Sequence, residues 1–469
     1  MKNIIALSMI AALSTATFAA DDMQTQIDSL TKEINKLKKD QKNTKKSLTK
    51  VKKATGGDNI KFGIDFRNAV DVIEYKNNET GESVSNNSLL TSRLWLTMAA
   101  APMDGLIFKG KLAIYSTWGA HIYDESTALK DWSASSKATD TIMRIKEAYF
   151  VYSNSLGSQP ISFSIGRRPS SNGILSNYRE NEPNSGSPVA HITNMEVNAA
   201  MVKFNTSRFV EGSYTKLIYG RAHSGEAQGV YGNDVKMSTP FADIDSYKED
   251  ENVDFTTFLG DAYNDGQYQL TYQWSHIFDT KGKSNTKTYP SGPSAGKPVV
   301  KGAAGFADLL SLTLISNGIG DEINDFLDDT TVFVSGAYTN YNAKNGHSLL
   351  GSEDGGSQDG QSIWAGIIIP DMMTDAGKLG FEYNYGSQYW TPITWAEDTA
   401  IGSKVAVRGS AYEAYWNFNL FGVKYLPSSL RATYAQHDYT PNNRCAGWVE
   451  PVAVDMTATD IRLAVSYRY

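Results

Sequence analysis

The sequence predicts an all-β transmembrane barrel of about sixteen antiparallel strands, preceded by an α-helical coiled coil. Three observations lead to this prediction. Apolar and polar residues alternate after residue 57, short and long connections alternate between these stretches, and the last stretch ends in an aromatic residue. No run after residue 20 approaches the ~18 consecutive apolar residues of a spanning helix. This excludes a helical membrane protein, whereas barrel strands alternate lipid-facing and lumen-facing residues.

Composition excludes several classes of function. The chain has 469 residues, a formal net charge of −7 and one cysteine, Cys445. A single cysteine excludes an internal disulfide framework and multi-cysteine metal sites. The net negative charge argues against nucleic acid as a partner. We predict no cofactor and no metal. We also predict no enzyme, because H-E-x-x-H does not occur and nothing in the sequence proposes a catalytic triad.

Residues 1–19 have the pattern of a signal peptide. Lys2 precedes the apolar run from Ile4 to Leu13, and Thr17 and Ala19 place small residues before a cleavage site at Ala20 or Asp21. This pattern is too short for a membrane span and directs a chain out of the cytoplasm.

Residues 20–56 are predicted to form a periplasmic coiled coil. Apolar residues step by four and three along one helix face, at Met23, Ile27, Leu30, Ile34 and Leu37. Such a seam favours self-association of helices. Ten lysines lie between Lys32 and Lys53. They form either a solvated helix face or a surface attracted to an anionic partner such as peptidoglycan.

Residues 57–469 are predicted to form the barrel. The first stretch alternates Ile60, Phe62 and Ile64 with polar or small residues, and fifteen more such stretches follow, ending with 460–469. Period two with one apolar face is the strand signal. In the stretch 142–152 the facing stays open, because Glu147 shares its parity with apolar residues.

Connection lengths favour a barrel over a soluble sandwich. Short turns alternate with long connections, which include 72–89, 168–194 and 279–306. Outer-membrane barrels have short periplasmic turns, long extracellular loops and an even strand number. Both ends of the barrel are then expected on the short-turn side, which places the coiled coil in the periplasm.

The final strand carries a candidate insertion signal. Ile461, Leu463, Val465, Tyr467 and Tyr469 share the outward parity. A final strand of this kind with a terminal aromatic residue resembles the signal read by the barrel-insertion machinery of the outer membrane. We name Tyr467 and Tyr469 as its key residues.

The layout resembles the trimeric general and anion-selective porins, some of which have an N-terminal coiled coil. The segments 60–66, 146–149 and 163–169 also resemble a Gram-negative outer-membrane family of unknown function. The resemblance implies a location in outer-membrane lipid and a homotrimer. It implies no ligand and no catalytic residue.

The inward parity carries more basic than acidic residues. The basic ones are Lys61, Arg67, Arg93, Lys109, Lys111, Arg144, Lys146, Arg431, Arg462 and Arg468. The acidic ones are Asp65, Glu382 and Glu413. Charged rings set the ion selectivity of pores. Two interpretations stay open: a basic lumen that favours anions, or ion pairs with carboxylates that leave no net field.

The stretch 168–194 is the first candidate for a constriction loop folded into the barrel. Arg167, Arg168 and Asn172 are its candidate lining residues. We therefore predict a porin-like channel for passive diffusion of small hydrophilic solutes, with a preference for anions. The alternative is an adhesin or structural tether with a closed lumen, whose coil contacts the cell wall.

Overall fold

The computed structural model describes residues 60–118, 143–182, 185–223, 252–288, 295–320, 323–374, 376–394, 399–441 and 448–469. The chain divides into two compact units, Met1–Asn59 and Ile60–Tyr469. The predicted signal peptide, the predicted coiled coil and Cys445 lie outside the described residues.

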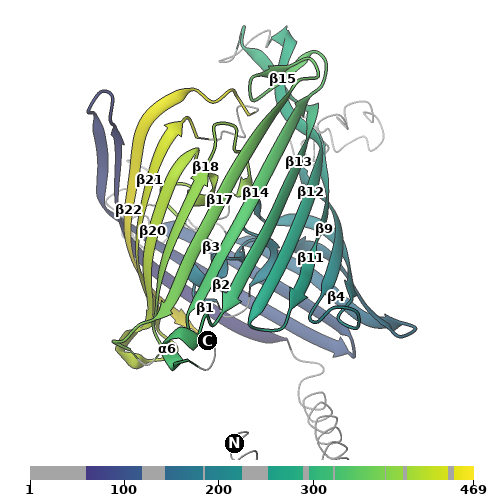
Figure 1. The fold of residues 1–469 in the computed structure, drawn as a ribbon, viewed down its shortest axis with the longest axis vertical. Helices are drawn as coiled ribbons and strands as arrows, with labels where there is room; N and C mark the ends of the chain where they lie inside the picture. The colour runs from purple at the N-terminus through teal and green to yellow at the C-terminus, as the bar shows by residue number, and fades with distance from the viewer. Residues whose placement is uncertain are drawn as a thin grey trace, which may run out of the picture. The chain divides into compact units, whose positions relative to one another are not determined.

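Sixteen strands of the second unit form one closed antiparallel ring (Figure 1). Each ring strand pairs with the next along the chain, and the last pairs with the first from Asp65↔Arg468 to Asn77↔Met456. The ring consists of β1 (Lys61–Asn77), β2 (Ser83–Met103), β3 (Leu106–Thr117), β4 (Arg144–Leu156), β5 (Gln159–Arg168), β9 (Val197–Asn205), β10 (Tyr214–His223), β11 (Val253–Asn264), β12 (Tyr268–Thr288), β13 (Pro298–Asn317), β14 (Thr331–Ala343), β17 (Ser357–Pro370), β18 (Lys378–Gly386), β20 (Gly409–Asn419), β21 (Pro427–Tyr439) and β22 (Ala453–Arg468). The predicted sixteen-strand antiparallel barrel is confirmed in the part of the chain that the structure describes.

The two ends of the barrel differ in their connections. One end, which we call the short-turn end, carries the tight turns at 104–105 and 157–158, the helix α6 (Asp325–Asp328), the 3-10 helix η4 (Leu420–Gly422) and the C-terminus. The other, the long-loop end, carries β15 (His347–Leu349) and β16 (Ser352–Glu353) (Figure 1). None of the helices in the described ranges is long and apolar enough to cross a membrane.

Two predicted long connections are largely strand instead. β1 and β2 stay paired as far as Lys76↔Ser83, so most of 72–89 is a hairpin. β12 and β13 likewise extend through most of 279–306. The prediction was wrong there because it required one apolar face. Beyond the apolar band of the outer face, backbone pairing continues without that alternation, as at Ser85 and Asn86.

The outer face carries large exposed apolar side chains. Phe62, Leu217 and Ile461 are between 48% and 68% exposed, although each lies within a paired strand. On the inner face the neighbouring residues are buried and mostly polar or small, as at Arg67 and Ala69. This is the inverted pattern of a barrel with lipid outside and a polar interior.

A β-bulge settles the facing of β4. Lys111 pairs with Glu147 and Leu112 with Ile145, so Lys146 is the extra residue. Lys146 donates to Ser171 and to the carboxylate of Glu196, which places its side chain inside. One inserted residue reverses the parity of every residue beyond it. Alternation alone therefore left this strand ambiguous.

Residues 169–196 fold into the barrel, and we call their described part the inner loop. It contains β6 (Gly173–Ile174), α4 (Ser176–Arg179), β7 (Gly186–Val189) and β8 (Thr193–Asn194). β8 pairs in parallel with β19 (Ile393–Thr394), which lies in the connection that also carries η3 (Lys404–Ala406).

Apolar contacts fix the inner loop to the barrel wall. Ile174 and Leu175 belong to one buried cluster with Phe333, Trp364 and Tyr415 of the wall strands. The ring of Tyr178 stacks on Phe333, with centroids 5.9 Å apart. Burying apolar groups of this size stabilises a contact by roughly 1.5–3 kcal/mol per side chain. The inner loop is thus fixed against β14, β17 and β20.

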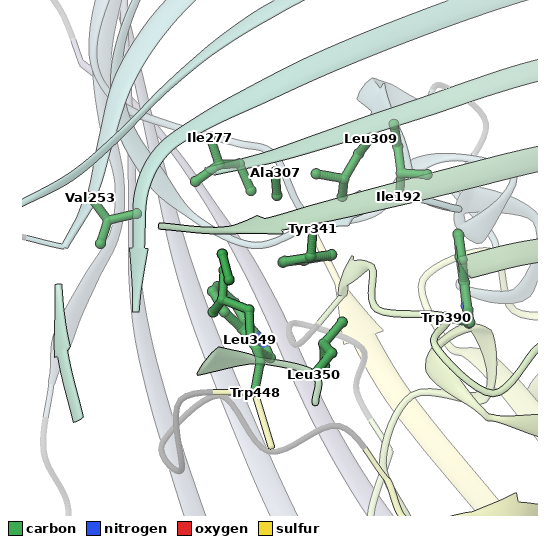
Figure 2. Packing of buried hydrophobic residues seen from close by; sticks show 11 residues of the cluster. Ile192, Val253, Ile277, Ala307, Leu309, Tyr341, Leu349, Leu350, Trp390 and Trp448 are labelled. Atoms are coloured by element: carbon green, nitrogen blue, oxygen red, sulfur yellow. The ribbon is translucent and has the colours of Figure 1, made fainter. Parts of the chain in front are cut away.

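A second apolar cluster lies towards the long-loop end (Figure 2). It joins wall residues such as Leu309 and Tyr341 to residues of four different connections. Those connection residues are Ile192, Leu349, Leu350, Trp390 and Trp448. The cluster therefore ties the loops of this end to the inner wall.

Candidate functional site

Between the inner loop and the wall formed by β1, β2 and β20 to β22 lies a cavity of about 30 Å³. Its charged lining consists of six guanidinium groups and one carboxylate, and we call it the arginine gap. The charged residues are Arg67, Arg93, Arg179, Arg431, Arg462, Arg468 and Glu180. Five of the six arginines come from wall strands and one, Arg179, from α4.

Strand register brings the wall arginines together in pairs. Arg67 lies directly opposite Arg93 across β1 and β2. Arg431 lies directly opposite Arg462 across β21 and β22. Like charges facing each other across strands are destabilising. The arrangement therefore requires nearby carboxylates.

Carboxylates sit beside the arginines rather than in the lining of the gap. Asp65 accepts from Arg93 at 3.2 Å and from Arg468 at 2.9 Å. Asp71 accepts from Nε of Arg462. Asp65 and Asp71 are both absent from the lining. The surface that faces the gap is consequently basic, although its arginines are partly compensated behind it.

A buried charge network adjoins the gap. Nζ of Lys404, in η3, lies 2.7 Å from Glu382 and also contacts Glu413. Glu413 lies 3.7 Å from Arg179 and 3.9 Å from Arg431. These carboxylates are 1% exposed. Buried charges of this kind are tolerated only when paired, so the network fixes η3 and α4 against the wall.

The inner loop is also tied to the wall by backbone acceptors. Nδ2 of Asn417 donates to the carbonyl of Tyr178 at 3.0 Å. Arg468 donates to the carbonyls of Glu180 and Asn181 at 3.3 and 3.2 Å. Burial raises the pKa of Tyr178 to about 12, so its hydroxyl is neutral at physiological pH.

Trp95 gathers further cations next to the gap. Its ring centroid lies 3.6 Å from the guanidinium carbon of Arg93, and 4.8 and 5.2 Å from the ammonium groups of Lys111 and Lys146. Cations over an indole face are attracted to its quadrupole. Lys111 also pairs with Glu147 at 2.5 Å. Trp95 occupies an otherwise polar, inward position of β2, and its ring thus attracts several cations of the lumen.

The structure brings together part of the predicted lining. Arg67, Arg93, Arg431 and Arg462 line the arginine gap. Lys111 lies beside it on Trp95. Three further predicted residues have exposed side chains and do not line the gap: Lys61, Lys109 and Arg144.

The predicted constriction residues require correction. Successive strand residues point to opposite faces and alternate ones to the same face. Arg167 therefore faces outward, like the exposed Phe163 and Ile165. Arg168 faces inward but lines a different cavity. Asn172 bonds within the inner loop instead, with its N–H donating to Asn194 at 3.2 Å.

Arg179 and Glu180 are the inner-loop residues that the sequence reasoning missed. They line the gap from α4, a single helical turn inside the long connection. No periodicity signals so short a helix. Asp71 was also missed, although it continues the inward parity of Asp65 and Arg67, so the sequence did contain that signal.

The predicted insertion residues lie at the barrel seam. The side chain of Tyr467 is exposed, in the outward register opposite Phe66. Tyr469 exchanges two backbone hydrogen bonds of 2.9 Å with Ile64. Their role in insertion stays a prediction. Within the described residues no group of three or more His, Cys, Asp or Glu is placed to hold a metal ion.

Comparison with solved structures finds outer-membrane proteins. The anion-selective porin from Comamonas acidovorans is 13% identical, with a TM-score of 0.46, over 88% of this chain and 100% of that one. OprB of Pseudomonas putida is 11% identical, with a TM-score of 0.47, over 90% and 96%. OmpT, an outer membrane protein of Vibrio cholerae, is 12% identical, with a TM-score of 0.46, over 87% and 97%.

Comparison with curated proteins gives no match. A family model described as "Protein of unknown function (DUF3373)" matches residues 83–466, which include fifteen of the sixteen ring strands in whole or in large part. The chain therefore belongs to the DUF3373 family.

Proposed function

We propose that this barrel is a porin-like channel of the bacterial outer membrane, through which small hydrophilic anions diffuse passively. The observation that carries the proposal is the lining of the arginine gap, with six guanidinium groups and one carboxylate. Guanidinium groups present planar sets of donors that suit carboxylates and phosphates. Rings of arginine or lysine in a pore favour anions.

The volume of the gap also limits which solutes can pass. This volume of about 30 Å³ is room for roughly one or two waters, because a cavity needs at least ~10–15 Å³ to hold one. A larger anion passes only if lining side chains move aside. The side chain of Arg468 is suited to this movement, because it is 29% exposed and hydrogen-bonds only to Asp65 and to loop carbonyls.

A second candidate function is a closed-lumen adhesin or tether. The observation in its favour is the firm attachment of the inner loop across the lumen by two apolar clusters. If the lumen is closed, the long loops and the predicted coil carry the adhesin or tether function.

The remaining predictions belong to the same proposal. We place the barrel in outer-membrane lipid after insertion by the barrel-assembly machinery, with the coil in the periplasm. Self-association through the coil gives a trimer, and the lysines of the coil contact peptidoglycan. The exposed apolar outer face supports the lipid location, while the coil lies outside the described residues.

The zero-current potential across a planar bilayer under a KCl gradient tests the anion preference. The wild-type channel is expected to give the sign of an anion-selective pore. Arg468→Gln removes one lining charge while Asp65 keeps Arg93 as its partner, so the potential should move towards zero. Lys109→Gln is the matched control, because Lys109 is exposed and outside the gap. A cation-selective sign, or equal shifts in both variants, would contradict the proposal.

A further inference from the structure

The inner loop has a second cavity on its other side, about 80 Å³ in volume. Its wall is formed by the inward faces of β9 to β12 and is mainly apolar. The lining includes Val197, Ala199, Met201, Ile218, Leu259 and Ile277. This apolar wall adjoins the cluster of Figure 2, with which it shares Val253 and Ile277. Passage of hydrophilic anions through the arginine gap does not account for it.

Two basic side chains line the same cavity. Nζ of Lys216 donates to the hydroxyl of Ser187 at 2.7 Å, and the guanidinium of Arg168 donates to the hydroxyl of Ser164. Lys203 lies directly opposite Lys216 across β9 and β10. The ammonium groups of both lysines lie near the ring of Tyr214, at 4.1 and 5.1 Å from its centroid.

These cations have neutral partners. In the described ranges, Arg168, Lys203 and Lys216 form no ion pair, unlike most arginines of the arginine gap. The carboxylate on the neighbouring strand, Asp261, accepts instead from Thr271 at 2.8 Å and from Gln269 at 3.1 Å. Basic side chains without a carboxylate in direct contact therefore border an apolar cavity.

We propose that this cavity binds short-chain aliphatic monocarboxylates, with the carboxylate at Lys216 and Arg168 and the alkyl chain against Ala199, Met201 and Ile218. The cavity is only about 80 Å³ in volume, so the alkyl chain is short, and we take butyrate as the longest probe. The site requires only a folded barrel, so it stands independently of whether the channel conducts.

Titration of the refolded full-length protein in lipid nanodiscs, followed by ligand-observed NMR, tests the site. Acetate, propionate and butyrate are the probes. Saturable binding is expected, tightening about fourfold with each added methylene. Lys216→Gln should weaken butyrate at least tenfold. Ala199→Leu should fill the cavity, keep acetate binding and abolish the gain with chain length. Lys61→Gln, an exposed lysine of β1 outside the cavity, should bind as the wild type does.

Three results would overturn the proposal: no saturable binding to the wild type, equal binding of acetate and butyrate, or unchanged butyrate affinity in Lys216→Gln. Heat-dependent migration in gel electrophoresis verifies that each variant is a folded barrel, and Ala199→Leu tests the site with every charge in place. If the barrel conducts but does not bind butyrate, the proposal of this site is wrong and the channel proposal stands. If the barrel binds butyrate but does not conduct, the channel proposal is wrong and the proposal of this site stands.

Discussion

At the scale of single residues, buried charged side chains in the barrel interior form ion pairs, and these pairs stabilise the fold. The contrast between Lys404 and Lys344 illustrates this. Lys404 is 3% exposed and serves two buried carboxylates. Lys344 contacts Asp279 at 2.5 Å, but both side chains are more than 40% exposed. The ion pairs of Lys404 compensate for the free energy lost when its charge is removed from water. Lys344 remains in contact with water, so its ion pair has no such cost to compensate.

Replacing each lysine by methionine separates the two cases. Lys404→Met leaves Glu382 without its cation, so we expect the free energy of unfolding to fall by about 3–5 kcal/mol. Lys344→Met should change it by at most ~1 kcal/mol. Urea unfolding of the protein in lipid vesicles measures both values. Equal losses would show that the Lys404 network does not stabilise the barrel.

His191 gives the inner loop a dependence on pH. Its Nδ1 and Nε2 lie 2.8 and 2.9 Å from the hydroxyls of Ser335 and Ser362, and its ring packs edge-on against Trp364 and Trp390. Burial lowers the pKa of His191 to about 3. The folded protein therefore keeps this imidazole neutral, while an unfolded chain protonates it near pH 6.5.

Acid should consequently weaken the fold. Between roughly pH 6.5 and pH 3 the unfolded state binds one proton more at this site, so stability falls by ~1.4 kcal/mol per pH unit as the pH is lowered. Unfolding at pH 7 and pH 5 measures the loss. His191→Asn should lose less than the wild type over that interval, whereas His347→Asn, at the partly exposed start of β15, should match it. The idea fails if all three proteins respond alike.

At the scale of elements, the regular strands could be predicted and the inner loop could not. Alternation located all sixteen ring strands, because one face meets lipid along each of them. It placed strand ends too early in β1 and β12, where polar residues continue the pairing above the lipid. It could not place α4 or η3, because their positions depend on contacts with distant residues such as Phe333 and Glu382.

The candidate site divides in the same way. Arg67, Arg93, Arg431 and Arg462 were predicted, because parity alone decides which side of a strand a residue faces. Arg167 was named beside Arg168 as a lining residue, although only one of two consecutive residues in a regular strand points inward. Arg179 required knowledge of how the inner loop folds. Tertiary contacts, rather than local pattern, determine that part of the site.

Deleting the inner loop tests its role as the barrier. Replacing residues 171–193 by a short Gly-Ser linker removes the apolar anchors and Arg179 together. We expect single-channel conductance to rise several-fold, because an empty sixteen-stranded barrel encloses an aqueous channel, and anion selectivity to fall. Shortening the β1–β2 hairpin beyond Lys76↔Ser83, also at the long-loop end, is the matched control and should leave conductance nearly unchanged. Unaltered conductance after loop removal would place the barrier elsewhere.

At the scale of the whole molecule, the inner loop divides the barrel interior into two unlike regions. One is the arginine gap, bounded by β1, β2 and β20 to β22. The other is the apolar cavity against β9 to β12, bordered by the basic side chains of Arg168 and Lys216. This division suits a channel that conducts anions along one side and holds a small amphiphilic anion on the other.

The central claim is that the folded barrel conducts through the arginine gap. Single-channel recording of the refolded full-length protein in a planar bilayer under a salt gradient tests it most directly. We predict discrete conductance steps whose reversal potential has the sign of an anion-selective pore. If a barrel shown to be folded by heat-dependent gel migration gives no steps, the channel proposal is wrong and the closed-lumen tether becomes the favoured function.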